Sequence, residues 1–152
     1  MPSGWFREEM GGVGMDNYTV LCVDDESCIL SLIRRLLRNE PYEIILAKNG
    51  EEAIEIMKKR EVALLISDYK MPGMSGLQLL RETREVSPQT ISILISALVN
   101  HDVVQTTVGE LGIFRCFYKP WDNGEFRSAI KEAIEEYRQV RDKNGPSPEQ
   151  VI

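Results

Sequence analysis

Short apolar runs alternate with amphipathic segments along most of the chain. Each apolar run has the length of a strand and few interior polar positions, which is typical of a parallel sheet covered on both faces. The predicted strands are Tyr18–Val23, Glu43–Ala47, Ala63–Ser67, Ile91–Ile95 and Ile113–Tyr118. The segments between them repeat apolar residues at helical spacing, so the pattern predicts an α/β domain with a doubly wound, parallel, five-stranded sheet.

Three predicted helices open with a residue that can cap the helix and a polar partner three positions later. The pairs are Asn49 with Glu52, Ser75 with Gln78, and Asp122 with Glu125. The last helix also carries an apolar stripe that predicts packing against the sheet, formed by Phe126, Ile130, Ala133, Ile134 and Tyr137. The segment Asp102–Leu111 is the weakest predicted helix, because it combines several β-branched residues with a glycine.

The chain has 152 residues, a length that suits one α/β domain. Residues 1–16 are rich in glycine and show no helical or strand period, so we expect a flexible leader there. The domain is expected to span residues 17–141, followed by a polar, proline-bearing tail or the start of a linker at residues 142–152. No apolar run approaches the length of a membrane span, and no membrane partner is expected.

Acidic residues outnumber basic ones, 24 to 18, and the formal net charge is -6. Because nucleic-acid binding needs a basic surface, we expect no direct contact between this domain and nucleic acid. The 3 cysteines, Cys22, Cys28 and Cys116, are odd in number and lack CxxC spacing. This usage is typical of reduced thiols, and it predicts a cytoplasmic protein.

Four of the predicted strands end in residues that can carry chemistry. The first strand is followed by Asp24, Asp25 and Glu26, the third by Asp68, the fourth by Ser96 and Ala97, and the fifth by Lys119 and Pro120. The carboxyl ends of parallel strands share one edge of the sheet, so these side chains should converge. Carboxylates without a nearby His or Cys suit Mg²⁺ or Mn²⁺. An amine and a hydroxyl beside such a cation suit a phosphoryl group carried by Asp68.

Each of these features has a plainer explanation when it is taken alone. Acids after a strand often favour the start of the next helix, as at Asp25 or Glu26, and a Lys-Pro pair often marks an exposed loop. The hydroxyl of Ser96 would commonly bond the backbone at the end of a strand. Their occurrence at successive strand ends of one sheet favours the functional interpretation.

Four motifs, in this order, resemble the receiver domains of two-component response regulators. They are VDDE (Val23–Glu26), ISDYKMPGMSG (Ile66–Gly76), ISA (Ile95–Ala97) and KPW (Lys119–Trp121). The resemblance extends over about residues 17–139. It implies a flavodoxin-like (βα)5 fold with strand order 2-1-3-4-5. It also implies a signalling switch that catalyses only its own phosphorylation and dephosphorylation and is not otherwise an enzyme.

The resemblance implies that Asp68 accepts a phosphoryl group from the phosphohistidine of a sensor histidine kinase or a phosphotransfer protein. Mg²⁺ (or Mn²⁺) would be held by Asp25, Asp68 and the backbone carbonyl of Lys70, with Asp24 acting indirectly. The phosphate-binding and switch residues would be Ser96, which swings towards the phosphate, Ala97, which leaves room for it, and Lys119, which contacts it. The Lys119–Pro120 peptide bond is expected to be cis.

Two positions bear on the switch surface. Receivers usually carry Tyr or Phe three residues before the lysine, and Cys116 at that position puts signal transmission by a ring in doubt. Trp121 either covers the start of the last helix or belongs to a partner surface. Receivers often form homodimers through the fourth helix, fifth strand and fifth helix, and the same surface would control an output partner or domain. The sequence KPWD also resembles receivers that precede HD-type cyclic-dinucleotide phosphodiesterase modules.

Three alternatives stay open on the sequence alone. A flavodoxin-like protein would bind the FMN phosphate after the first strand, where the acids of Asp24–Glu26 would repel it. An aspartyl-phosphate hydrolase would carry its nucleophile on the first strand. A degenerate receiver would act only as a binding module, and the intact acids, Ser96 and Lys119 argue against it. The tail is too short for an effector domain, so we expect a stand-alone receiver or part of a longer regulator.

Overall fold

The computed structural model describes residues 18–97, 106 and 108–144. The predicted leader, most of the segment Asp102–Leu111 and the residues after 144 lie outside this described part. Residues 108–111 are helical, so the described end of the weak segment has the predicted conformation. The helix α6 (Asn123–Asn144) continues past residue 141, where the sequence predicts the domain to end.

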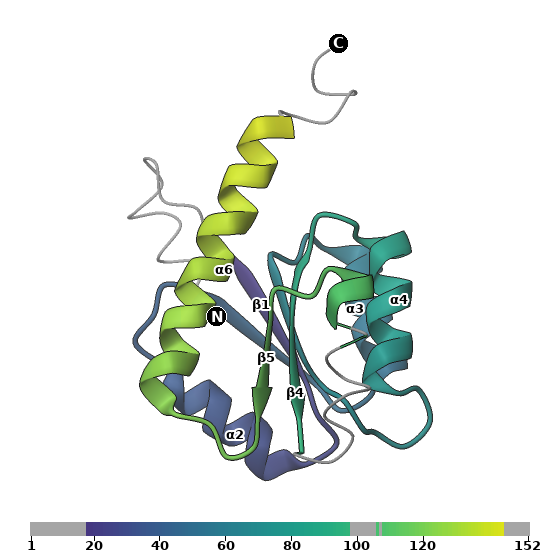
Figure 1. The fold of residues 1–152 in the computed structure, drawn as a ribbon, viewed down its shortest axis with the longest axis vertical. Coiled ribbons are helices and arrows are strands. Elements are labelled where there is room, and N and C mark those ends of the chain that lie inside the picture. The colour runs from purple at the N-terminus through teal and green to yellow at the C-terminus, as the bar shows by residue number, and fades with distance from the viewer. Residues whose placement is uncertain (1–17, 98–105, 107, 145–152) are drawn as a thin grey trace.

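In the described residues, five parallel strands form the sheet (Figure 1). They are β1 (Thr19–Val23), β2 (Glu43–Ala47), β3 (Leu64–Asp68), β4 (Ile91–Ser96) and β5 (Arg115–Tyr118), in the order β2-β1-β3-β4-β5. This arrangement confirms the predicted flavodoxin-like fold and strand order. β5 is shorter than predicted, because the Ile113 N–H donates to the Val108 carbonyl and closes the preceding helical turn instead of joining the ladder.

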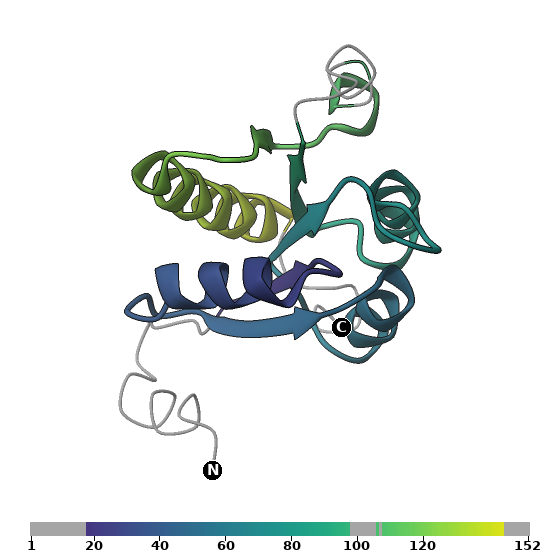
Figure 2. The same cartoon turned by 90° about the horizontal axis from the view of Figure 1, so that it is seen from below.

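Helices cover both faces of the sheet (Figure 2). Besides α6 they are α2 (Ser27–Leu36), α3 (Gly50–Lys59) and α4 (Gly76–Val86). α2 and α6 pack on one face, and α3 and α4 pack on the other. Successive strand residues point to opposite faces, so Val20 and Cys22 join the core under α2 and α6, whereas Leu21 and Val23 join the core under α3 and α4. Burial on both faces explains the continuous apolar runs of the sequence.

The predicted helix starts are confirmed by hydrogen bonds from backbone N–H groups to the capping side chains. The side chain of Asn49 accepts from the Glu52 N–H at 2.8 Å, that of Ser75 from the Gln78 N–H at 3.2 Å, and that of Asp122 from the Glu125 N–H at 2.8 Å. Each cap contributes about 1 kcal/mol to helix stability. The apolar stripe of α6 is confirmed as well, since Phe126, Ile130 and Ala133 are fully buried.

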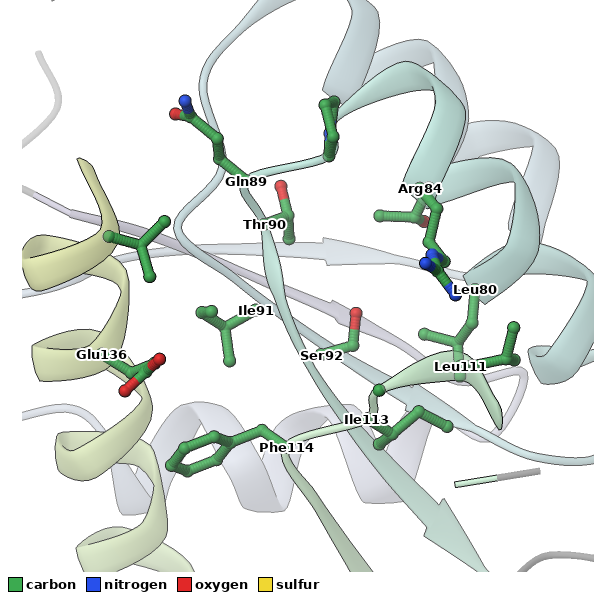
Figure 3. Close-up of a pocket in the computed structure, with 14 residues that line it drawn as sticks. Leu80, Arg84, Gln89, Thr90, Ile91, Ser92, Leu111, Ile113, Phe114 and Glu136 are labelled. Carbon is green, nitrogen blue, oxygen red and sulfur yellow. The ribbon is translucent and has the colours of Figure 1, made fainter. Parts of the chain in front are cut away.

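A cavity of about 580 Å³ opens at the amino-terminal end of β4 (Figure 3). It lies between α4, the start of β4, the loop before β5 and the second half of α6, and its walls include Ile91 and Phe114. Arg84 and Glu136 stand on opposite sides of it. Because the strands are parallel, this cavity lies at the end of the sheet opposite to the predicted acidic site. Among the described residues, no helix is both long enough and apolar enough to span a membrane.

Candidate functional site

The carboxyl ends of β1, β3 and β5 bring acidic and basic side chains to one edge of the sheet. Asp24 and Asp25 follow β1, Asp68 is the last residue of β3, and Lys119 follows β5. One carboxylate oxygen from each of Asp24, Asp25 and Asp68 lies within 4.8 Å of the other two. Asp24 and Asp68 are buried and Asp25 is exposed, so the cluster is rooted in the domain and reaches solvent at Asp25.

The ammonium group of Lys119 lies among the carboxylates of this edge. Its Nζ atom is 3.3 Å from Asp68 Oδ1, 3.4 Å from Glu26 Oε1 and 3.6 Å from Asp24 Oδ2. Burial of the lysine lowers its pKa, but the negative charges of Asp24 and Asp68 outweigh this effect, and the pKa is raised overall. Lys119 is therefore a cation at neutral pH.

Asp24 is the more deeply buried of the two inner acids, with 1% of its surface exposed. Its Oδ1 atom accepts a hydrogen bond from the Glu26 N–H at 2.9 Å, whereas its Oδ2 atom has no hydrogen-bond donor among the described residues. Burial raises the pKa of Asp24 to about 6, although the Glu26 N–H acts in the opposite direction. A buried oxygen without a hydrogen-bond donor is costly, and the Lys119 ammonium 3.6 Å away offsets this cost only in part, since the pKa of Asp24 stays raised.

Asp68 is held by the loop that follows β3. Its Oδ1 atom accepts a hydrogen bond from the Tyr69 N–H at 3.0 Å, and its backbone carbonyl accepts one from the Ser67 hydroxyl at 2.9 Å. Burial raises the pKa of the Asp68 carboxyl, and the positive charge of Lys119 partly offsets this rise. The carboxylate is thus fixed in place by its own backbone and faces the lysine.

Gly76 supports Asp68, a role that the sequence did not predict. A Cβ atom at this position would lie 2.1 Å from the Asp68 carbonyl oxygen and 2.9 Å from the Tyr69 Cα atom. The Gly76 N–H also donates to the Tyr69 carbonyl at 2.8 Å. The loop after β3 therefore folds back onto the backbone of Asp68, where only glycine fits. The glycine that ends the second motif was the available signal, but spacing alone cannot reveal a close backbone approach.

The remaining predicted site residues surround this cluster less directly. Ser96 is buried at the end of β4, and its hydroxyl donates to the Ala97 carbonyl at 2.8 Å, so it does not point a proton at Asp68. Ala97 and Lys70 are exposed. The Lys119–Pro120 peptide bond is cis, the form that the resemblance implies.

Cys116 and Trp121 lie on opposite sides of Lys119 in the sequence. Cys116 is half-buried in β5, and burial raises the pKa of its thiol. The Trp121 ring stacks on Phe126 at a centroid distance of 4.7 Å, and Phe126 in turn meets Phe117 edge-on at 5.2 Å. Trp121 therefore packs over the start of α6, which is the first of the two alternatives that the sequence left open. A partner-surface role for Cys116 or Trp121 stays a prediction.

The donor set of the acidic cluster fits a hard divalent cation. It consists of carboxylate oxygens from Asp24, Asp25 and Asp68, and the cluster contains no His or Cys ligand. The unpartnered Oδ2 atom of Asp24 is the kind of buried oxygen that a cation or its bound water would satisfy.

Comparison with known proteins agrees with this geometry. The model of the response regulator receiver domain family matches residues 20–131. The chain belongs to this family. Over 120 residues the receiver domain is 33% identical to sporulation initiation phosphotransferase F of Bacillus subtilis, a match that covers 79% of this chain and 96% of that protein. Receiver domains of this family are signalling switches rather than classical enzymes, so the family assignment replaces the flavodoxin-like and hydrolase alternatives.

Longer relatives and solved structures also match the receiver domain. Over 117 residues it is 31% identical to the hydrogenase transcriptional regulatory protein HoxA of Cupriavidus necator, covering 77% of this chain and 24% of that protein. The chain thus spans 24% of the length of such hydrogenase regulators. The signal receiver domain of an HD domain-containing protein from Pseudomonas fluorescens Pf-5 superposes with a TM-score of 0.77 at 30% identity, covering 82% of this chain and 99% of that one.

Proposed function

We propose that this receiver domain takes a phosphoryl group from a phosphohistidine onto Asp68 and thereby switches an output surface. One observation carries the proposal. The carboxylates of Asp24, Asp25 and Asp68 meet within 4.8 Å, and the Lys119 ammonium lies 3.3 Å from the carboxylate that would react. Receiver domains of this family are phosphorylated by histidine kinases or phosphotransfer proteins, which supports a phosphohistidine as the donor.

The transfer requires an ionised Asp68 carboxylate. An Asp68 oxygen attacks the phosphorus, the new O–P bond forms as the P–N bond to the donor histidine breaks, and the histidine nitrogen keeps the electron pair. Lys119 favours the ionised carboxylate before the reaction and offsets the charge of the phosphoryl oxygens afterwards. The Ser96 hydroxyl would turn away from the Ala97 carbonyl to donate to a phosphoryl oxygen, and the small methyl side chain of Ala97 would leave room for the phosphate.

A divalent cation belongs to the proposal. Asp25, Asp68 and the backbone carbonyl of Lys70 would hold Mg²⁺ or Mn²⁺, with Asp24 acting indirectly. When bound, the cation supplies positive charge that offsets the charge of the phosphoryl group. The oxygen donors of the cluster and the unpartnered Asp24 Oδ2 atom support this assignment.

The output surface would comprise the helical residues 108–111, β5 and α6, through which the domain would control an output partner or form a homodimer.

The free thiols of Cys22, Cys28 and Cys116 suit a cytoplasmic location. The net charge of -6 speaks against direct binding of nucleic acid by this domain.

Labelling with acetyl phosphate in the presence of Mg²⁺ tests the proposal. The wild type should take up phosphate, and the Asp68→Asn variant should not, because an amide of the same shape cannot act as the nucleophile. Asp122→Asn is the matched control, since it makes the same chemical change at the cap of α6, where Asn caps equally well. Equal labelling of Asp68→Asn and wild type would overturn the assignment of Asp68. Failure of the wild type and the control to label would instead indicate a degenerate receiver.

A further inference from the structure

Glu26 stands at the N-cap position of α2, yet its side chain does not cap this helix. Acidic side chains at helix starts commonly accept hydrogen bonds from the first-turn N–H groups. The Glu26 carboxylate reaches across the site instead, and the Lys119 ammonium donates to its Oε1 atom at 3.4 Å. This contact joins the last residue of the first motif to the first residue of the fourth motif, 93 positions further along the sequence.

The backbone of Glu26 is tied down on both sides. Its N–H donates to Asp24 Oδ1 at 2.9 Å, and its carbonyl accepts from the N–H groups of Ile29 and Leu30. The side chain therefore starts from a well-fixed point beside the acidic cluster. Its orientation towards Lys119 is a feature of the site rather than of a loose loop.

Lys119 is held between inner and outer acids. The side chains of Asp24 and Asp68 are 2% and 9% exposed, that of Lys119 is 23% exposed, and that of Glu26 is 56% exposed. The inner acids belong to the proposed metal and phosphate site, and Glu26 approaches the ammonium from the solvent side. An incoming phosphoryl group on Asp68 must therefore compete with Glu26 for the same ammonium protons.

We propose that Glu26 is a positioning residue that acts through Lys119, an inference that rests on the proposed function. Glu26 shares the Lys119 ammonium with Asp68 while Asp68 is unmodified, and it gives up this contact when a phosphoryl group is present. Glu26 thereby weakens the interaction between Lys119 and a phosphoryl group on Asp68. It also sets how readily the domain returns to its unphosphorylated state.

The physical reason is competition for one cation. A phosphoryl group adds negative charge within reach of Lys119, and a nearby carboxylate both competes for the ammonium and repels the new charge. Because Glu26 is exposed, solvent and salt screen the contact, so its effect should be a few-fold and not many orders of magnitude. If Glu26 merely attracted the divalent cation, its removal would have the opposite sign and weaken phosphate-analogue binding.

Titration with beryllofluoride at saturating Mg²⁺, followed by calorimetry, measures the effect. Glu26→Gln should bind beryllofluoride about threefold to fivefold more tightly than wild type, because the competitor is neutralised while its shape is kept. Glu51→Gln is the matched control, since it removes the same charge from the first turn of α3, and it should bind as wild type does. Glu26→Asp, which keeps the charge but shortens the side chain, should also bind more tightly than wild type. Affinity unchanged or weakened in Glu26→Gln would overturn the inference.

A double-mutant cycle shows whether the effect runs through the lysine. In a Lys119→Met background, the gain from Glu26→Gln should shrink to less than about twofold, because the shared ammonium is gone. A gain of equal size in both backgrounds would mean simple charge repulsion and would overturn the positioning role. Wild type that fails to bind beryllofluoride with Mg²⁺ would overturn the proposed function itself, so the two failures are distinguishable.

Discussion

The two ends of the sheet differ in whether their buried polar side chains have hydrogen-bond partners. At the amino-terminal end, the Tyr137 hydroxyl donates to Glu61 Oε2 at 2.7 Å, and the Thr90 hydroxyl donates to the Val62 carbonyl at 2.7 Å. At the carboxyl end, buried Asp24 keeps an oxygen without a hydrogen-bond donor. The first end satisfies these polar groups within the described chain, whereas the second leaves Asp24 Oδ2 and Trp121 Nε1 without a hydrogen-bond partner among the described residues.

This difference distinguishes polar groups that stabilise the fold from polar groups that are kept for chemistry. Hydrogen-bonded side chains stabilise the native state modestly, and a buried carboxylate whose hydrogen bonds are incomplete destabilises it. A protein retains such a charge where chemistry needs it, at a cost in stability. The comparison therefore predicts that neutralising or removing a buried polar group changes stability with opposite signs at the two ends.

The most damaging change should be Gly76→Ala at the carboxyl end. The added methyl group would overlap the Asp68 carbonyl oxygen, 2.1 Å away, and must displace the loop that holds the reactive carboxylate. We expect a loss of about 3 kcal/mol in the free energy of unfolding, measured in urea. Gly109→Ala is the control, because a Cβ atom there meets no atom within 4 Å of the described residues and the site is helical. Similar losses in both variants would refute the close-approach explanation.

Asp24→Asn should stabilise the protein when Mg²⁺ is absent. Burial raises the pKa of Asp24 from 3.8 to about 6, so the folded state holds this proton more tightly than the unfolded chain does. The contribution of this group to stability therefore falls as pH rises from about 4 to about 6. At neutral pH, where Asp24 is ionised in both states, Asn should add about 1.5 kcal/mol to the free energy of unfolding.

Urea unfolding near neutral pH and near pH 4 checks this expectation, since the gain should shrink at the acidic pH, where Asp24 is protonated in the folded state. Asp122→Asn, the same change at the exposed cap of α6, should not show the gain at neutral pH. A destabilised Asp24→Asn variant at neutral pH would contradict the view that this acid is held at a cost.

Tyr137→Phe should have the smallest effect of the three, with the opposite sign to Asp24→Asn. It removes the hydroxyl that donates to Glu61, and we expect a loss of about 1 kcal/mol in the free energy of unfolding. Burial raises the pKa of Tyr137, so the hydroxyl stays protonated and available as a donor at neutral pH, where the loss is measured. Tyr42→Phe is the control, because the Tyr42 hydroxyl makes no hydrogen bond within the described part of the chain. Equal losses in both variants would show that the bond to Glu61 contributes nothing.

Local patterns carried the prediction of the fold. The strand positions followed from apolar runs buried on both faces, and the helix starts followed from capping pairs such as Ser75 with Gln78. The start of β5 was predicted two residues too early, since Ile113 and Phe114 are as apolar as a strand requires. A hydrogen bond from Ile113 to Val108 decides the boundary there, and no hydropathy pattern records it.

The site was predictable only as far as strand ends and motifs reach. Placing Asp24, Asp68 and Lys119 at one edge needed nothing more than a parallel sheet. The roles of Gly76 and Glu26 were not predicted. The role of Gly76 depends on how the loop after β3 folds back, and that of Glu26 depends on which way its side chain turns at the shared edge of the sheet.

Hydrophobic period and capping act over a few neighbouring residues, so the strands, the helix starts and the residue types at the strand ends could be predicted locally, whereas the strand order followed from the resemblance of the motifs to receiver domains. Only the tertiary structure decided which oxygen of Asp24 lacks a donor, which glycine touches the Asp68 carbonyl and which outer acid approaches Lys119. Distances of a few ångströms between remote segments depend on how the whole core packs, and side-chain spacing along the chain does not encode them one by one.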